Sequence, residues 1–202
     1  MAAYADILYL KSQLGISDAN DDALLQRALN AASLWIRRYT GRSFEAETAA
    51  TKVFYPGNSR YIDLSPDIRT LTTIEVDVNG DGTYTDDFAA SDYLLLPLNP
   101  EPDAGIYSRV EIASLSGKSF PSRRRVRILG DWGYVVGGVA PEDVQQACLM
   151  QAARLFKRVK EAPFGVLQTT DLGQFTRIAS MDPDVKALLD PYKASTKVWI
   201  VA

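Results

Sequence analysis

The chain has 202 residues, 22 of them basic and 25 acidic, which gives a formal net charge of −3. Hydrophobic residues make up 47% and charged residues 23%, the balance of an ordinary globular protein. An acidic balance argues against a general nucleic-acid binder, which normally carries a basic excess. No signal-peptide pattern and no membrane-length apolar run are visible, so we expect no membrane association and a protein that stays in the cell that makes it.

Two helices are predicted at the start of the chain. Tyr4–Leu14 has apolar residues on one side and ends at Gly15, a residue suited to a left-handed cap. The second helix runs to about Tyr39, ends at Gly41 and keeps the i, i+3, i+4 apolar spacing without a break. Acidic residues that can cap it are Asp18, Asp21 and Asp22, and the arginines on its opposite face are Arg27, Arg37 and Arg38.

From about Thr51 the helical period gives way to short runs rich in β-branched and aromatic residues. Glycine, proline, asparagine and aspartate separate these runs, as is typical of antiparallel strands. The predicted strands are 52–55, 60–64, 72–78, 92–96, 108–112 and 125–129. Asn79–Gly82 is a strong hairpin turn signal. The pattern predicts an all-β insert of roughly eighty residues, a size that suits a small β module.

A third helix is predicted over Pro141–Lys160. Its apolar residues cover about half of its circumference, so it needs at least two neighbours, one of them the helix that ends near Tyr39. Residues 161–180 read as a long loop with room for one short extended piece, 182–190 as a short helix, and 196–202 as an apolar strand-like tail. The expected fold class is therefore α+β, a small α-helical bundle core with an inserted antiparallel β module. The expected divisions are 1–50 and 136–195 for the helical core, 51–135 for the insertion, and 196–202 for the tail.

Few residues point to catalysis. There is no histidine, which removes the commonest general base and most zinc sites, and no glycine-rich phosphate loop precedes a helix. The single cysteine, Cys148, lies on the apolar side of its helix and is expected to be a buried, inert thiol in a reducing compartment. We therefore predict that the protein is not an enzyme, with no catalytic residue, no metal and no cofactor.

Three other features have competing interpretations. Asp77–Thr83 resembles the first half of a calcium loop, but Phe88 stands where a bidentate glutamate belongs, so a polar hairpin turn is favoured. The basic run places Arg123, Arg125 and Arg127 on one side of a strand, as a solvated edge, a contact for an acidic partner, or a nucleic-acid site. The tail residues Val198, Trp199, Ile200 and Val201 either fold back onto the β module or add a strand to another protein.

With these elements placed, the chain resembles the head-tail connector (neck adaptor) proteins of long-tailed bacteriophages. The resembling segments, in family order, are Leu10–Ile16, Asp21–Leu25, Trp35–Phe44, Gly130–Tyr134, Val139–Val144, Asp182–Val185 and Leu189–Tyr192. The middle of the insert, about 51–121, follows the family by position rather than by motif.

The resemblance implies a structural protein of the virion neck, made in the host cytoplasm. It implies a homo-oligomeric ring beneath the portal protein, dodecameric in the virion, that extends the DNA channel and docks a stopper or tail-completion protein. Packaged DNA would pass through without sequence-specific binding. The resemblance also makes Val198, Trp199, Ile200 and Val201 candidates for the portal interface.

Two alternatives belong to other classes of protein. One is a ligand- or calcium-binding β module on a helical stalk, which requires metal binding by Asp77, Asn79 and Asp81. The other is a carboxylate enzyme, which requires acidic residues that converge in one pocket with perturbed pKa values.

Overall fold

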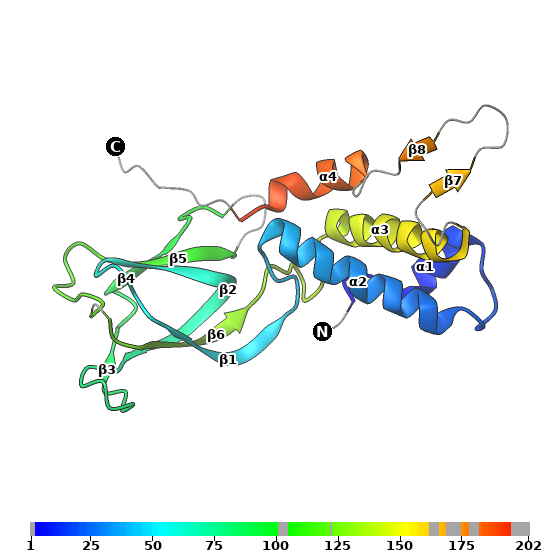
Figure 1. Ribbon diagram of the computed structural model, residues 1–202. Helices are drawn as coiled ribbons and strands as arrows, with labels where there is room; N and C mark the ends of the chain where they lie inside the picture. Colours follow the sequence, from blue (N-terminus) through cyan, green and yellow to red (C-terminus); the bar gives the residue numbers. More distant parts are fainter. Residues whose placement is uncertain are drawn as a thin grey trace. The chain divides into compact units, whose positions relative to one another are not determined.

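The computed structural model describes residues 3–100, 105–121, 123–161, 166–168, 175–177 and 182–194. Within these ranges the chain forms two compact units, a helical unit from 1–41 and 140–202 and a β unit from 42–139 (Figure 1). The expected α+β class is confirmed.

The helical unit begins with α1 (Ile7–Leu14) and α2 (Asp22–Thr40). The α1 helix starts later than predicted because the Asp6 side chain accepts the Leu8 amide and caps it there. Both helices end at the predicted glycines, Gly15 and Gly41, whose φ angles are 68° and 72°. The predicted capping of α2 by an acidic side chain is wrong for its N-cap residue Asp21, which makes no side-chain cap bond. Asp21 instead pairs with Lys160 of α3.

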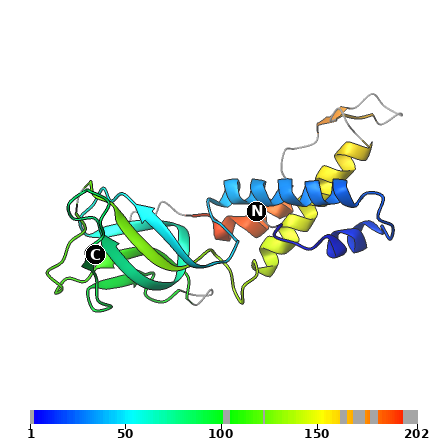
Figure 2. The ribbon, with the colours of Figure 1, turned by 90° about the horizontal axis from the view of Figure 1, so that it is seen from below.

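The unit is completed by α3 (Glu142–Glu161), a hairpin of β7 (Val166–Gln168) and β8 (Phe175–Arg177), α4 (Pro183–Leu189) and a 3₁₀ turn (Asp190–Tyr192). The sequence predicted α3 and α4 and a long loop with room for one short extended piece, where the structure has the two strands of a hairpin. As predicted, α3 has more than one neighbour: it packs against α1, α2 and α4 (Figure 2). These neighbours belong to the same chain, so the wide apolar face of α3 by itself does not require another subunit.

The contact between α2 and α3 is close. Cys148 Sγ lies 3.4 Å from Ser33 Oγ, and both side chains are fully buried. The apolar residues of α3 that are buried are Val144, Ala147, Cys148, Leu149, Ala152 and Phe156. Met150, Ala153 and Leu155 are half-buried, and Val159 is exposed over 57% of its surface.

The β unit contains β1 (Glu47–Phe54), β2 (Tyr61–Val76), β3 (Asp86–Asp87), β4 (Tyr93–Leu96), β5 (Tyr107–Ile112) and β6 (Val126–Trp132). The main sheet has the order β1-β6-β2-β5-β4, with β3 also paired to β2, and every pair is antiparallel.

Strand β2 joins two runs that the sequence predicted as separate strands. Its first half pairs with β5 and its second half with β6, and Ile68 aligns with both Tyr107 and Trp132. The register shifts between Asp63 and Ile68, so one strand serves two neighbours in succession.

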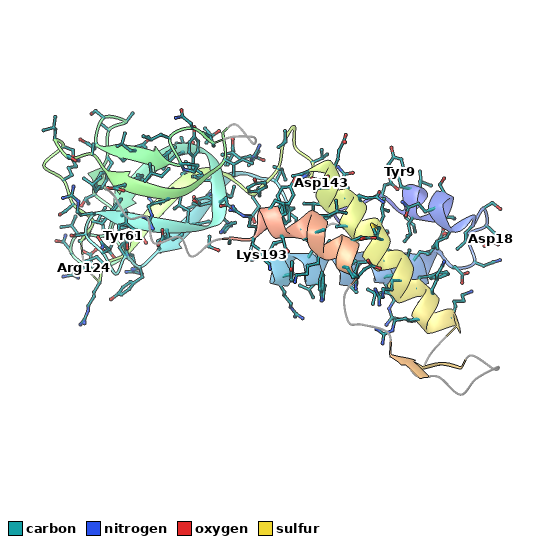
Figure 3. The ribbon with its side chains drawn as sticks, turned by 90° about the horizontal axis from the view of Figure 1, so that it is seen from above. Tyr9, Asp18, Tyr61, Arg124, Asp143 and Lys193 are labelled. Carbon is teal, nitrogen blue, oxygen red and sulfur yellow. The ribbon has the colours of Figure 1, made fainter. Side chains whose placement is uncertain are left out.

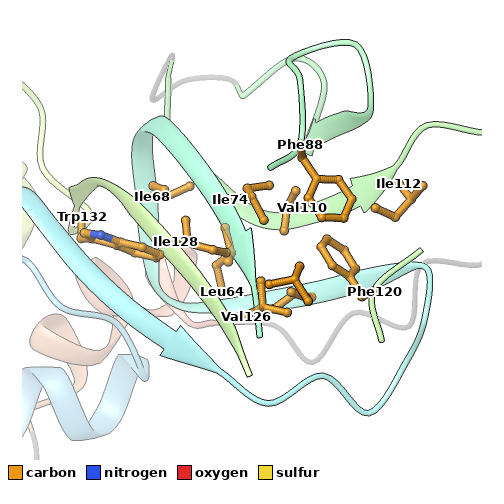
Figure 4. Packing of buried hydrophobic residues seen from close by; sticks show 12 residues of the cluster. Leu64, Ile68, Ile74, Phe88, Val110, Ile112, Phe120, Val126, Ile128 and Trp132 are labelled. Atoms are coloured by element: carbon orange, nitrogen blue, oxygen red, sulfur yellow. The ribbon is translucent and has the colours of Figure 1, made fainter. Parts of the chain in front are cut away.

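The bent sheet encloses one apolar core (Figure 4). Its buried members are Ile62, Leu64, Ile68, Ile74, Val76, Phe88, Val110, Ile112, Phe120, Val126, Ile128 and Trp132. Alternation along β6 is complete, with Val126, Ile128 and Trp132 fully buried, because successive side chains of a strand point to opposite faces.

Candidate interaction surfaces

Two of the sequence segments that carry the family resemblance meet at the base of the β unit. The Tyr134 amide donates to Ser43 O at 2.7 Å. The Phe44 and Tyr134 rings meet edge to face at 5.7 Å, and the Arg42 guanidinium lies 4.7 Å from the centre of the Tyr134 ring. With Asp67, these residues form what we call the base cluster. It joins the first and last residues of the inserted segment.

Asp67 connects this cluster to the bend of β2. Its Oδ1 accepts from Arg42 Nη1 at 2.6 Å, and its backbone carbonyl accepts from the Gly133 amide at 2.8 Å. Burial raises the pKa of the Asp67 carboxyl, although the charge and hydrogen bond of Arg42 act in the opposite direction. The ion pair is thus an internal contact that supports the fold.

Gly133 is required here by its conformation and its surroundings. Its φ angle is 104°, and a Cβ added to it would lie 1.9 Å from Glu45 O. The neighbouring Trp132 is fully buried and donates from Nε1 to Ala50 O at 2.8 Å. The Gly130–Tyr134 segment therefore has a structural role.

The basic run divides into residues with different environments. Arg125 directly precedes β6 and Arg127 lies within it; they lie on the same side, as predicted, and pair with Asp77 and Glu75. Arg123 has a φ angle of 59° and lies in the turn before β6, so the expectation that it belongs to the same strand face is wrong. Two of the three predicted patch residues are thus neutralised by carboxylates of the same unit.

The loop after β2 is built around Asp77. Its Oδ1 accepts from the Gly80 amide at 2.7 Å, and its Oδ2 accepts from the Gly82 amide at 3.2 Å and from Arg125. Burial raises the pKa of Asp77, but the hydrogen bonds from Arg125 and the two amides outweigh it and leave the pKa below its ordinary value. Both oxygens are therefore used inside the loop, which supports the polar-turn interpretation over a calcium loop.

The described residues contain no group of histidine, cysteine, aspartate and glutamate arranged to hold a metal ion. Cys148 is buried, and this burial raises the pKa of its thiol despite a hydrogen bond with Ser33. A thiol in that state is a poor nucleophile. Among the described helices, none is long and apolar enough to cross a membrane.

The predicted portal-interface residues Val198, Trp199, Ile200 and Val201 lie outside the described residues. The last described residues are tied to the end of α2. Tyr39 Oη donates to Asp190 Oδ1 at 2.5 Å, and the Ala194 amide donates to Thr40 O at 2.6 Å. The last described residue, Ala194, therefore lies beside the C-terminal end of α2.

Comparisons with known proteins support one family. Residues 4–72 match the model of the phage gp6-like head-tail connector proteins. No curated protein sequence matches the chain. The fold is similar to a chain from the neck of an empty GTA particle computed with C6 symmetry, with a TM-score of 0.64, 18% identity, and coverage of 98% of this chain and 95% of that chain.

Two further structures share the fold at the same coverage of 98% and 95%. One is a chain from the neck of the native GTA particle computed with C12 symmetry, with a TM-score of 0.61 and 19% identity. The other is from the virion of a native gene transfer agent particle, with a TM-score of 0.58 and 20% identity. Residues 4–72 thus match the connector model in sequence, and the chain shares its fold with these particle chains along nearly its whole length.

Proposed function

We propose that the protein is a structural connector in the neck of a phage-like particle. The observation that carries this proposal is the match of residues 4–72 to the head-tail connector model. The shared fold agrees with it, since the similar chains come from particle necks. The protein then acts in the virion, where its role is structural: it links other proteins of the particle.

In finer detail, the protein forms a homo-oligomeric ring beneath the portal, extends the DNA channel and docks a stopper or tail-completion protein. The C6 and C12 symmetries of the similar necks support a ring, and twelve copies is the number we propose. DNA passes through without sequence-specific contacts, which suits a chain with a net charge of −3. Synthesis takes place in the host cytoplasm.

A connector role requires no catalytic activity. The buried acid Asp67 is paired with Arg42, and Asp77 is held by two amides and Arg125, so each of these carboxylates has a structural partner. We therefore propose a non-enzymatic role without metal or cofactor. The calcium- or ligand-binding alternative is not retained, because both oxygens of Asp77 are engaged within the loop.

The location in the neck is tested by removing the gene from the producing strain and supplying a tagged copy. We expect particles without the gene product to lack a completed neck, and the tagged copy to restore it. Electron microscopy of labelled particles should place the tag between head and tail. A label on the capsid surface, or complete necks without the protein, would contradict the proposal.

For the tail, we propose that Val198, Trp199, Ile200 and Val201 add a strand to the portal. Large apolar side chains gain about 1.5–3 kcal/mol each on full burial, so an unpartnered apolar tail is unfavourable. Deletion of 198–202 should leave a folded protein that no longer joins portal rings in a co-sedimentation assay. The change Lys197→Ala serves as the matched control, and normal joining by the deleted form would refute this role.

A further inference from the structure

The outer surface of α2 is basic, and its arginines form no ion pair with the described part of the chain. Beyond its first turn, α2 has no acidic residue. Arg27, Arg37 and Arg38 are exposed, and no carboxylate among the described residues pairs with them. Between the arginines lie small or half-buried side chains, Asn30, Ala31 and Leu34. We call this surface, with Ala23, the α2 outer face.

The outer surface of α3 has a different charge pattern. It begins with the exposed acids Glu142 and Asp143, continues through Gln146, Met150 and Ala153, and ends at the exposed Lys157. Asp143 accepts only a long bond, 3.4 Å, from Tyr192 Oη, while Glu142 has no ion pair within the described ranges. We call this surface the α3 outer face. Its middle is neutral, like that of α2.

The two outer faces point in opposite directions. Each helix buries the side that is turned toward the other, through Leu29 and Ser33 on α2 and Cys148 on α3. Residues opposite to a buried stripe face away from the partner helix. The helical unit therefore presents the basic face on one side and the acid-led face on the other.

The charges of opposite sign lie at the same end of the unit. Asp21 pairs with Lys160 and Ser33 contacts Cys148, so α2 and α3 run antiparallel. The C-terminal arginines of α2 are thus level with the N-terminal acids of α3. Figure 3 shows Asp143 at the same end as Lys193, which stacks on Tyr39 of α2, and Asp18 at the other end.

A ring imposes a head-to-tail contact, in which one surface of each copy meets a different surface of the next. Rotation about the ring axis keeps every feature at its own height, so, in a ring whose axis runs along the helices, charges that must meet have to be level. The two outer faces satisfy this requirement, with Arg37 and Arg38 level with Glu142 and Asp143. Small side chains in the middle, such as Ala31 and Ala153, allow two helices to approach closely.

We propose that neighbouring copies in the ring join through these faces, the α2 outer face of one copy against the α3 outer face of the next. The inference rests on the proposed function and names the interface of that assembly. Arg37 and Arg38 would meet the carboxylates of Glu142 and Asp143 of the adjoining copy, while Ala31 and Met150 would lie near the centre of the contact.

Cysteine crosslinking in assembled particles tests the geometry. Ala31 and Met150 are level, so a chain with Ala31→Cys and Met150→Cys should give a ladder of crosslinked oligomers under mild oxidation. The matched control combines Ala31→Cys with Ala187→Cys, an exposed position on α4, and should give no ladder. A complete neck without a ladder would overturn the interface and leave the connector function standing. Absence of the unmodified protein from the neck would instead refute the proposed function.

Charge reversal tests the pairing. Arg37→Glu with Arg38→Glu, or Glu142→Arg with Asp143→Arg, should each reduce ring formation at least about tenfold, because like charges then face each other. The chain with all four changes should recover to within about threefold of the original protein. Lys186→Glu on α4 is the control and should assemble normally. If the variant with all four changes does not recover, the proposal is overturned. It is also overturned if the arginine variant forms normal rings that fail to retain DNA, because the arginines would then contact phosphates rather than a neighbouring copy.

Discussion

The helical unit and the β unit use their charged side chains differently. In the β unit, four of the arginines are paired with acids of the same unit: Arg42 with Asp67, Arg109 with Asp63, Arg125 with Asp77 and Arg127 with Glu75. In the helical unit, Arg27, Arg37 and Arg38 have no such partner within the described residues. Paired charges hold a sheet and its loops together, whereas unpaired ones on an exposed helix remain free to attract another molecule. Because Arg27, Arg37 and Arg38 lie together on one side of α2, that helix offers the charged surface best placed to contact another molecule.

The largest expected effect concerns the base of the β unit. Gly133→Ala should lower the free energy of unfolding by at least about 3 kcal/mol, since left-handed strain of about 1–3 kcal/mol is joined by a backbone clash with Glu45 O. Gly137→Ala is the control, because Gly137 also has a positive φ, 61°, but has open space around it. Its cost should be about 1 kcal/mol. Equal costs in urea unfolding would mean that the close approach at Gly133 has no effect on stability.

The next effect separates buried from exposed ion pairs. Asp67→Ala removes the buried carboxylate that pairs with Arg42 and should cost about 3 kcal/mol, the range for breaking a buried pair. The pair of Lys11 with Asp22 in the helical unit is more open, with 43% of the Asp22 side chain exposed. Asp22→Asn should therefore cost about 1 kcal/mol or less. Equal shifts of the urea midpoint for Asp67→Ala and Asp22→Asn would mean that the buried pair of the β unit contributes no more to stability than the more exposed pair of the helical unit.

The sequence predicts the local features of both units and the packing of α2 against α3, but it misses the contacts between distant segments of the β unit. Helical periodicity and glycine caps locate α1, α2 and α3 to within a few residues, and alternation identifies β6. The continuity of β2 is not predicted, because its bend depends on two neighbouring strands that exchange at Ile68. The base cluster is likewise missed, although the sequence resemblance had singled out its two segments, because no local pattern shows that Ser43 bonds to Tyr134. The ion pairs of Arg125 and Arg127 could not be predicted either, because they depend on the register in which β2 pairs with β6.

A smaller effect should appear at low pH. The pKa of Asp77 in the folded protein lies below its ordinary value, because hydrogen bonds from Arg125 and two amides outweigh burial. Its contribution to stability is then present above the unfolded pKa, about 3.9, and is lost as the pH falls below that value. Urea unfolding between pH 2.5 and 7 should therefore show a shallower loss for Asp77→Asn than for the original protein. Identical slopes would mean that the Asp77 carboxylate gains nothing from its partners.

The smallest effect on folding is expected at Arg38, a residue that we propose acts in assembly. Arg38 is exposed and unpaired by any described carboxylate, so Arg38→Ala should change the free energy of unfolding by no more than about 0.5 kcal/mol. The same change should weaken ring formation, because it removes a charge from the α2 outer face. If Arg38 instead supported folding through contacts in its own chain, Arg38→Ala would lower both the stability of the fold and ring formation. Thermal unfolding beside an assembly assay therefore tells an interface arginine from a structural one, and a substantial loss of stability in Arg38→Ala would place this residue with the paired arginines of the β unit.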